Sequence, residues 1–168
     1  MANLSKKKKV IVDTSALISM ATIDLIEEVA ELFEVIITYS VLRELEEFSK
    51  FDDPYGKASK NVIKCKTNFV ILDVDVKETV QFIEKTDNEL YNLANEKSLP
   101  IITDDIKLSR HISGNIETHF SSFFLQALIS SGNLSKEKAL NLLEKLRDLR
   151  NWRNNLIYLT TKEFIEKM

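Results

Sequence analysis

The sequence predicts an α/β protein in which a parallel sheet of about five strands lies between two layers of helices. Short apolar runs rich in β-branched residues, of which residues 10–12 are the clearest, alternate with longer segments whose apolar residues recur at helical spacing. This alternation is typical of a parallel sheet covered by helices on both faces. Connections are expected to be short, because the 168 residues include only three glycines and two prolines.

The composition indicates one globular domain over residues 1–168. Apolar residues make up 44% and charged residues 29% of a chain long enough to bury a sizeable core. The net charge of −3 argues against binding nucleic acid by bulk positive charge, although it allows a local basic rim. The single cysteine, Cys65, fits a reducing compartment and is expected to be a small helix residue. No apolar run reaches membrane-spanning length, so we expect a cytoplasmic protein.

The first strand ends in a carboxylate. Residues 10–12 are three β-branched residues in a row, as expected of a strand buried on both faces. Asp13 follows directly, and Thr14 or Ser15 can cap a helix over residues 14–20. In open α/β sheets ligands bind at the carboxyl ends of the strands, so Asp13 is either a functional acid or a turn residue.

The next segment predicts helix, strand and helix. Asp24 is expected to cap the second helix, and residues 35–38 form a short strand. The third helix begins near Ser40, and its expected buried stripe comprises Val41, Leu45 and Phe48. Glu44 lies beside this stripe, from where it can face along the edge of the sheet.

Pro54 and Gly56 are expected to break the third helix over residues 51–56. A helix over about 57–66 and a strand over 69–72 follow, and residues 77–85 are either helical or irregular. Thr86 and Glu89 match a capping box, which places Asp87 in the first turn of the next helix.

A fourth strand over 100–103 ends in Asp104 and Asp105. The last third of the chain predicts a helix over 106–112, an edge strand over 116–119, and further helices over 121–131, after Ser135 and over 161–167. We therefore expect a core over about 8–120 and C-terminal helices over about 121–168.

Acids from separate segments are expected to meet at one edge of the sheet. Asp13 and the Asp104–Asp105 pair end strands, and right-handed crossovers bring the helices that carry Glu44 and Asp87 back across the sheet. Clustered carboxylates repel one another unless they share protons or bind a cation. Carboxylate oxygens without a Cys or His pattern favour Mg²⁺ or Mn²⁺, and such ions suit attack by water on a phosphodiester.

Each acid also has a purely structural interpretation. Asp13 can be a turn residue, Glu44 a solvated helix residue, and Asp87 a stabiliser of the first helical turn. Asp104 and Asp105 can be a loop and a helix cap. Only the joint occurrence of these acids at equivalent edges favours a metal site.

The motifs together resemble PIN-domain nucleases. Residues 10–18 (VIVDTSALI), 38–45 (TYSVLREL), 86–94 (TDNELYNLA) and 101–105 (IITDD) are similar to the four acidic motifs of that family in order and spacing. The resemblance implies Asp13, Glu44, Asp87 and Asp105 as catalytic metal ligands, with Asp104 as an adjacent or alternative ligand. It also implies that Thr14, Ser15 and Thr103 orient the carboxylates by hydrogen bonding.

The resemblance further implies a three-layer α/β/α sandwich with strand order 3-2-1-4-5. It implies cleavage of single-stranded or structured RNA with Mg²⁺ or Mn²⁺, as in VapC toxins and ribosomal-RNA-processing PIN proteins. Homodimers are common in that family, and toxin–antitoxin members have an antitoxin partner. The segment after residue 120 resembles the tail of a prokaryotic PIN subgroup.

Basic residues around the acids are candidates for contact with nucleic acid. Lys107, Arg110 and His111 follow the fourth motif directly. Other candidate groups are Lys57, Lys60 and Lys64; Arg147, Arg150 and Arg153 beside Trp152; and Lys6 to Lys9. For each group a solvated charged face is the alternative, and for Trp152 a core or dimer-contact position.

Two further functional classes remain as alternatives. The chain can be a catalytically weak PIN-like scaffold or nucleic-acid-binding module, which a metal titration would distinguish from an enzyme. A phosphoaspartyl phosphatase would need a second aspartate two residues after Asp13, where Ser15 stands. The nuclease is therefore the leading hypothesis.

Overall fold

A computed structural model describes residues 7–152 and 155–168 and contains a five-stranded parallel sheet in the order β3-β2-β1-β4-β5. The strands are β1 (Lys8–Val12), β2 (Phe33–Thr38), β3 (Val70–Leu72), β4 (Ile101–Ile102) and β5 (Thr118–His119). Ile11 of β1 pairs with Ile36 of β2 on one side and Ile101 of β4 on the other. The predicted fold class and strand order are confirmed.

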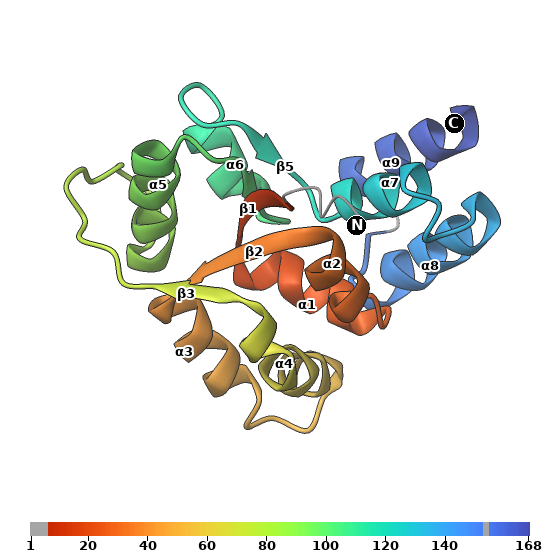
Figure 1. The fold of residues 1–168 in the computed structure, drawn as a ribbon, viewed down its shortest axis with the longest axis horizontal. Coiled ribbons are helices and arrows are strands. Elements are labelled where there is room, and N and C mark those ends of the chain that lie inside the picture. Colours follow the sequence, from red (N-terminus) through yellow and green to blue (C-terminus); the bar gives the residue numbers. More distant parts are fainter. Residues whose placement is uncertain (1–6, 153–154) are drawn as a thin grey trace, which may run out of the picture.

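Helices cover the two faces of this sheet in the way right-handed crossovers require. The helices between β1 and β3 are α1 (Thr14–Thr22), α2 (Ile26–Leu32), α3 (Tyr39–Phe48) and α4 (Pro54–Lys64), with a 3₁₀ turn, η1, at Lys66–Asn68. The helices α5 (Lys85–Lys97) and α6 (Ile106–Ile112) come after β3 and β4. Figure 1 shows α5 and α6 on the side of the sheet opposite to α1, α3 and α4.

The central strand is buried on both faces, as its sequence predicts. Val10, Ile11 and Val12 have no exposed surface, and Ile101 and Ile102 of the neighbouring strand are equally buried. The carboxyl end of β1 is therefore fixed within the core, and the residue that follows it, Asp13, is held by the same packing.

Three C-terminal helices gather at one end of the molecule (Figure 1). They are α7 (Ser122–Ser130), α8 (Lys136–Leu149) and α9 (Leu156–Lys167). The last helix is longer than the expected 161–167. Trp152 is only 5% exposed and belongs to the core, so the interpretation of this residue as a base-stacking side chain is wrong. Arg153 and Lys6 lie outside the described residues.

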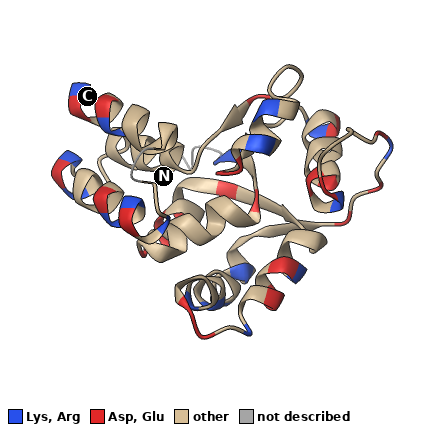
Figure 2. Ribbon diagram, turned by 180° about the vertical axis from the view of Figure 1, so that it is seen from behind, with Lys and Arg blue, Asp and Glu red and all other residues tan. Residues whose placement is uncertain are grey.

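Charges of both signs are spread over the outer helices of the described structure. Figure 2 shows Lys and Arg alternating with Asp and Glu along these helices instead of separating onto opposite faces. Within the described ranges, no helix is both long and apolar enough to cross a membrane.

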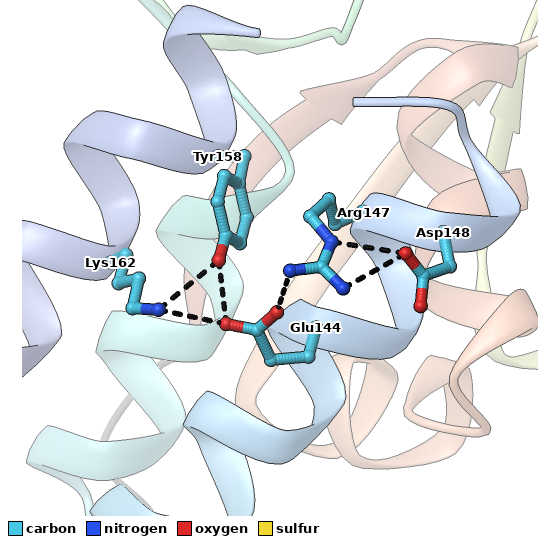
Figure 3. Close-up of polar contacts among 5 residues, drawn as sticks. All are labelled: Glu144, Arg147, Asp148, Tyr158 and Lys162. Carbon is cyan, nitrogen blue, oxygen red and sulfur yellow. Dashed lines mark hydrogen bonds and ion pairs between the residues drawn. The ribbon is translucent and has the colours of Figure 1, made fainter. Parts of the chain in front are cut away.

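A polar cluster joins α8 to α9 (Figure 3). The Tyr158 hydroxyl donates to Glu144 Oε1 at 2.6 Å, and Lys162 Nζ lies 3.0 Å from the same oxygen. Arg147 pairs with both Glu144 and Asp148, so its guanidinium is already committed within the C-terminal helices. This pairing makes Arg147 a poor candidate for contact with nucleic acid.

Several helix starts differ from the sequence-based expectation. Asp24 has a φ of 57° and does not cap α2, whose N-cap is Leu25. The helix α3 ends at Phe48, before the break expected over 51–56, and Pro54 and Gly56 lie in the first turn of α4, where the Asp53 carboxylate accepts from the Gly56 N–H at 2.7 Å. Pro is favoured in a first helical turn because its missing N–H would have no partner there.

The helix α5 begins two residues earlier than expected. Glu84 is its N-cap, and a capping box links Glu84 to Asp87 in place of the expected Thr86–Glu89 pair. The segment before it, 77–84, is irregular. Phe48, expected in the buried stripe of α3, is 41% exposed, whereas Val41 and Leu45 are buried.

Candidate active site

A cavity of about 400 Å³ lies where the carboxyl ends of the strands meet the first turns of the following helices. Carboxylates from four separate segments line it: Asp13, Glu44, Asp87 and Asp105. Glu84 adds a fifth acid to the wall. The structure therefore brings one acid from each of the four sequence motifs to a single cavity.

Asp13 stands directly after β1 and is the N-cap of α1. The residue is 6% exposed, and its carboxylate oxygen Oδ2 accepts from Ser15 Oγ at 2.6 Å and from Thr103 Oγ1 at 2.8 Å. Burial raises the pKa of Asp13, and the charge of Glu44 adds to that rise, while the two hydroxyl donors oppose it. The Asp13 carboxyl is therefore harder to ionise than an exposed aspartate.

Glu44 lies half-buried on α3 and faces the cavity, as its place beside the apolar stripe predicts. Its Oε2 accepts from Thr14 Oγ1 at 2.6 Å. Thr14, Ser15 and Thr103 thus all donate to carboxylates of the cavity, as the family resemblance implies. The hydroxyls fix the orientation of Asp13 and Glu44.

Asp87 projects from the first turn of α5, where the Glu84 backbone N–H donates to Oδ2 at 3.3 Å. The pKa of Asp87 is raised to about 7, chiefly by burial and then by the negative charge of Asp13. The charges of Asp105 and Glu84 add to the rise, and the hydrogen bond from Glu84 opposes it. These couplings follow from the closeness of the acids to one another.

The two aspartates after β4 have different surroundings. Asp105 lines the cavity and caps α6, with Oδ1 accepting from the N–H groups of Lys107 and Leu108 at 2.7 and 3.1 Å. Asp104 is absent from the cavity wall. Its carboxylate accepts from Ser19 Oγ at 2.5 Å and from the Ser121 N–H at 2.8 Å, which ties α1 to the start of α7.

The donor set of the cavity fits a hard divalent cation. Among the described residues, no three Asp, Glu, His or Cys side chains are grouped tightly enough to enclose an ion as they stand. Mg²⁺, however, keeps several of its waters and binds proteins directly through only one or two carboxylates. The cavity has room for a hydrated ion that one or two of these carboxylates would bind directly, with its waters reaching the others.

The basic candidates lie in different places. Arg150 lies in the cavity wall itself. Lys107, Arg110 and His111 are exposed on α6 beyond Asp105, and His111 Nδ1 lies 2.7 Å from the Lys107 carbonyl oxygen. Lys57, Lys60 and Lys64 lie on α4, outside the wall of this cavity.

Four residues of the wall were not predicted as site residues: Ile18, Phe48, Tyr55 and Glu84. The spacing Glu84-x-x-Asp87 is that of a capping box and identifies Glu84 as a neighbour of Asp87. No sequence signal places Phe48 or Tyr55 here, because their position depends on how α3 packs against α4.

The chain is similar to proteins of known family and fold. A family model described as a PIN domain, DUF3368, matches residues 9–166. A PilT N-terminus domain protein from the hyperthermophilic archaeon Sulfolobus solfataricus P2 superimposes with a TM-score of 0.51 at 13% identity, over 71% of this chain and 92% of that one.

A domain of a functionally unknown protein from Methanocaldococcus jannaschii DSM 2661 gives a TM-score of 0.47 at 23% identity, over 67% of this chain and 90% of that one. No curated protein matches at the significance required. At 13% identity the match to the Sulfolobus solfataricus protein shows the fold alone.

Proposed function

Since the chain belongs to the PIN-domain family, whose members are in general nucleases, we propose that it is a ribonuclease dependent on Mg²⁺ or Mn²⁺. The observation that supports this proposal is the convergence of Asp13, Glu44, Asp87 and Asp105 on one cavity. Raised pKa values at Asp13 and Asp87 are the expected mark of carboxylates that need a cation.

In this proposal the four acids of the cavity hold the ions, and Thr14, Ser15 and Thr103 keep the carboxylates of Asp13 and Glu44 turned to them. Bound ions would supply an activated water and neutralise charge on the phosphate. No histidine is needed as a base. Asp104 has a structural role in this account, since its carboxylate is occupied by Ser19 and Ser121.

RNA as substrate, a homodimeric state, an antitoxin-type partner and a cytoplasmic location are further parts of this proposal. The dispersed surface charge supports recognition by a local site over binding through a broad basic face (Figure 2). The competing function is that of a catalytically weak scaffold or nucleic-acid-binding module, which would keep the fold and bind no ion at the acids.

The test is cleavage of a fluorescent RNA with Mn²⁺ by the parent protein, Asp13→Asn and Asp24→Asn, purified side by side. Asp24 is a matched control, because its exposed carboxylate lies outside the cavity and pairs only loosely with Lys145 at 3.5 Å. We expect the parent and Asp24→Asn to cut, chelator to stop both, and Asp13→Asn to lose at least about a hundredfold in rate. Equal cutting by Asp13→Asn would refute the proposal.

A further inference from the structure

Two aromatic side chains line the acidic cavity and remain exposed to solvent. Phe48, at the end of α3, is 41% exposed, and Tyr55, in the first turn of α4, is 38% exposed. Both line the same wall as Asp13 and Glu44. Aromatic side chains that are partly exposed to water beside a cavity are suited to stacking on a planar ligand group.

A cation lies against one of these rings. The guanidinium carbon of Arg150 lies 5.3 Å from the centre of the Tyr55 ring. Among the described residues that line the cavity, Arg150 is the only Lys or Arg. Arg147, one turn earlier, is paired with Glu144 and Asp148. Within the described ranges Arg150 forms no such ion pair, and the carboxylate that its charge acts on, Asp104, lies outside the cavity wall. Its charge is therefore available to an anion in the cavity.

We propose that Phe48, Tyr55 and Arg150 form a subsite for single-stranded RNA, in which the rings stack on unpaired bases and Arg150 binds a backbone phosphate. The inference rests on the proposed function and assigns three side chains of this chain to substrate binding. The bases of a duplex are already stacked and paired, so their faces are closed to Phe48 and Tyr55. When an arginine stacks on an aromatic ring, its N–H groups point outward in the plane of the guanidinium and can still donate to phosphate oxygens.

The subsite gives the C-terminal helices a part in recognition. Arg150 is the C-cap of α8, whereas Phe48 and Tyr55 belong to the helices that follow β2. The RNA would therefore lie between the C-terminal helices and the α3–α4 pair, with its backbone directed to the carboxylates. An RNA bound in this way is held next to the phosphodiester bond that the carboxylates would cleave.

The test measures binding separately from cleavage. Fluorescence anisotropy in Mg²⁺, in the Asp13→Asn background, compares a labelled single-stranded RNA, its duplex, and the same strand with abasic residues. We expect the single strand to bind at least tenfold more tightly than the duplex. Adding Tyr55→Ala should weaken binding of the base-bearing strand on the order of tenfold and leave binding of the abasic strand unchanged.

Matched variants separate stacking from loss of structure. Tyr55→Phe keeps the ring and should bind as the parent does, whereas Tyr55→Leu keeps only the apolar bulk and should bind as weakly as Tyr55→Ala. Phe164→Ala removes a ring that is 50% exposed on α9, outside the cavity, and should change nothing. Arg150→Gln should weaken binding of the base-bearing and abasic strands alike and lower the slope of log affinity against log salt by about 1.

Equal affinity for single strand and duplex, or unchanged binding by Tyr55→Ala and Arg150→Gln, would overturn the subsite. Cleavage by the parent with Mn²⁺, measured in parallel, keeps the two proposals apart. If the parent cuts RNA but these variants bind normally, the subsite fails and the ribonuclease stands. If single-strand binding depends on Tyr55 and Arg150 but no cutting occurs, the ribonuclease fails and the subsite stands.

Discussion

Asp13 illustrates how a buried carboxylate can be kept ready for a cation. Only 6% of the residue is exposed, yet the hydroxyls of Ser15 and Thr103 donate to one carboxylate oxygen. These donors reduce the penalty of ionisation without supplying a positive charge of their own. The pKa of Asp13 stays raised because burial outweighs these donors. A divalent ion bound beside the carboxylate would lower this pKa.

The first prediction concerns the pH dependence of stability in chelator. The pKa of Asp87 in the folded protein, about 7, lies above its ordinary value of 3.8, so the folded state binds this proton more tightly than the unfolded state. The stability from protonated Asp87 is full below about pH 4 and is lost as the pH rises through about 7. The pKa of Asp13 is also raised, so this residue too makes the folded protein less stable as the pH rises.

Urea unfolding between pH 5 and 8 in chelator measures this loss. We expect the free energy of unfolding of the parent to fall over this range and that of Asp87→Asn to fall less steeply. Asp24→Asn, outside the cavity, should keep the slope of the parent. A slope that is the same in Asp87→Asn and the parent would contradict the electrostatic account of Asp87.

At the residue scale, the sequence predicted the acids from local patterns and left one choice open. Asp13 and the Asp104–Asp105 pair were found because they follow β-branched runs that end buried strands. Which of the pair faces the cavity depends on Ser19 and Ser121, which lie far from them in sequence. Periodicity carries no information about such partners, and the role of the acids as metal ligands stays a prediction.

At the element scale, α4 shows why the prediction that Pro54 and Gly56 interrupt helical structure is wrong. Asp53, Pro54 and Gly56 together form a helix start: a capping carboxylate, a residue without an N–H, and a residue without a side chain. The glycine is required by a close approach of the preceding chain. A Cβ at position 56 would lie 2.0 Å from the Phe51 carbonyl oxygen and 2.9 Å from that of Phe48.

The second prediction is that Gly56→Ala destabilises the protein by at least about 2 kcal/mol, because backbone atoms and not flexible side chains must move. Chemical denaturation measures the loss. Gly114→Ala is the matched control, since a Cβ there would meet nothing within 4 Å, and it should change the free energy of unfolding by less than about 1 kcal/mol. Equal stability of the two variants would contradict the packing described at α4.

At the scale of the whole molecule, the alternation of strands and helices was enough to predict an α/β sheet. The strand order came with the family resemblance, and the sheet confirms it. The placement of the C-terminal helices was beyond sequence reasoning, because it depends on long-range contacts such as Asp104 with Ser121. Those helices bring Arg150 to the cavity, so residues far apart in sequence complete one wall.

The central claim is that acids from four segments act together as one metal site. Calorimetric titration of Mn²⁺ into the metal-free parent, Asp13→Asn and Asp24→Asn at pH 7 tests it most directly, in two buffers of different ionisation enthalpy. The account predicts binding by the parent and Asp24→Asn with release of protons, because Asp87 has a pKa of about 7 and loses its proton to the buffer when the ion binds. It predicts that Asp13→Asn binds at least about tenfold more weakly. Binding of Mn²⁺ to Asp13→Asn with the affinity of the parent, or no binding to any of the three proteins at millimolar concentration, would contradict it.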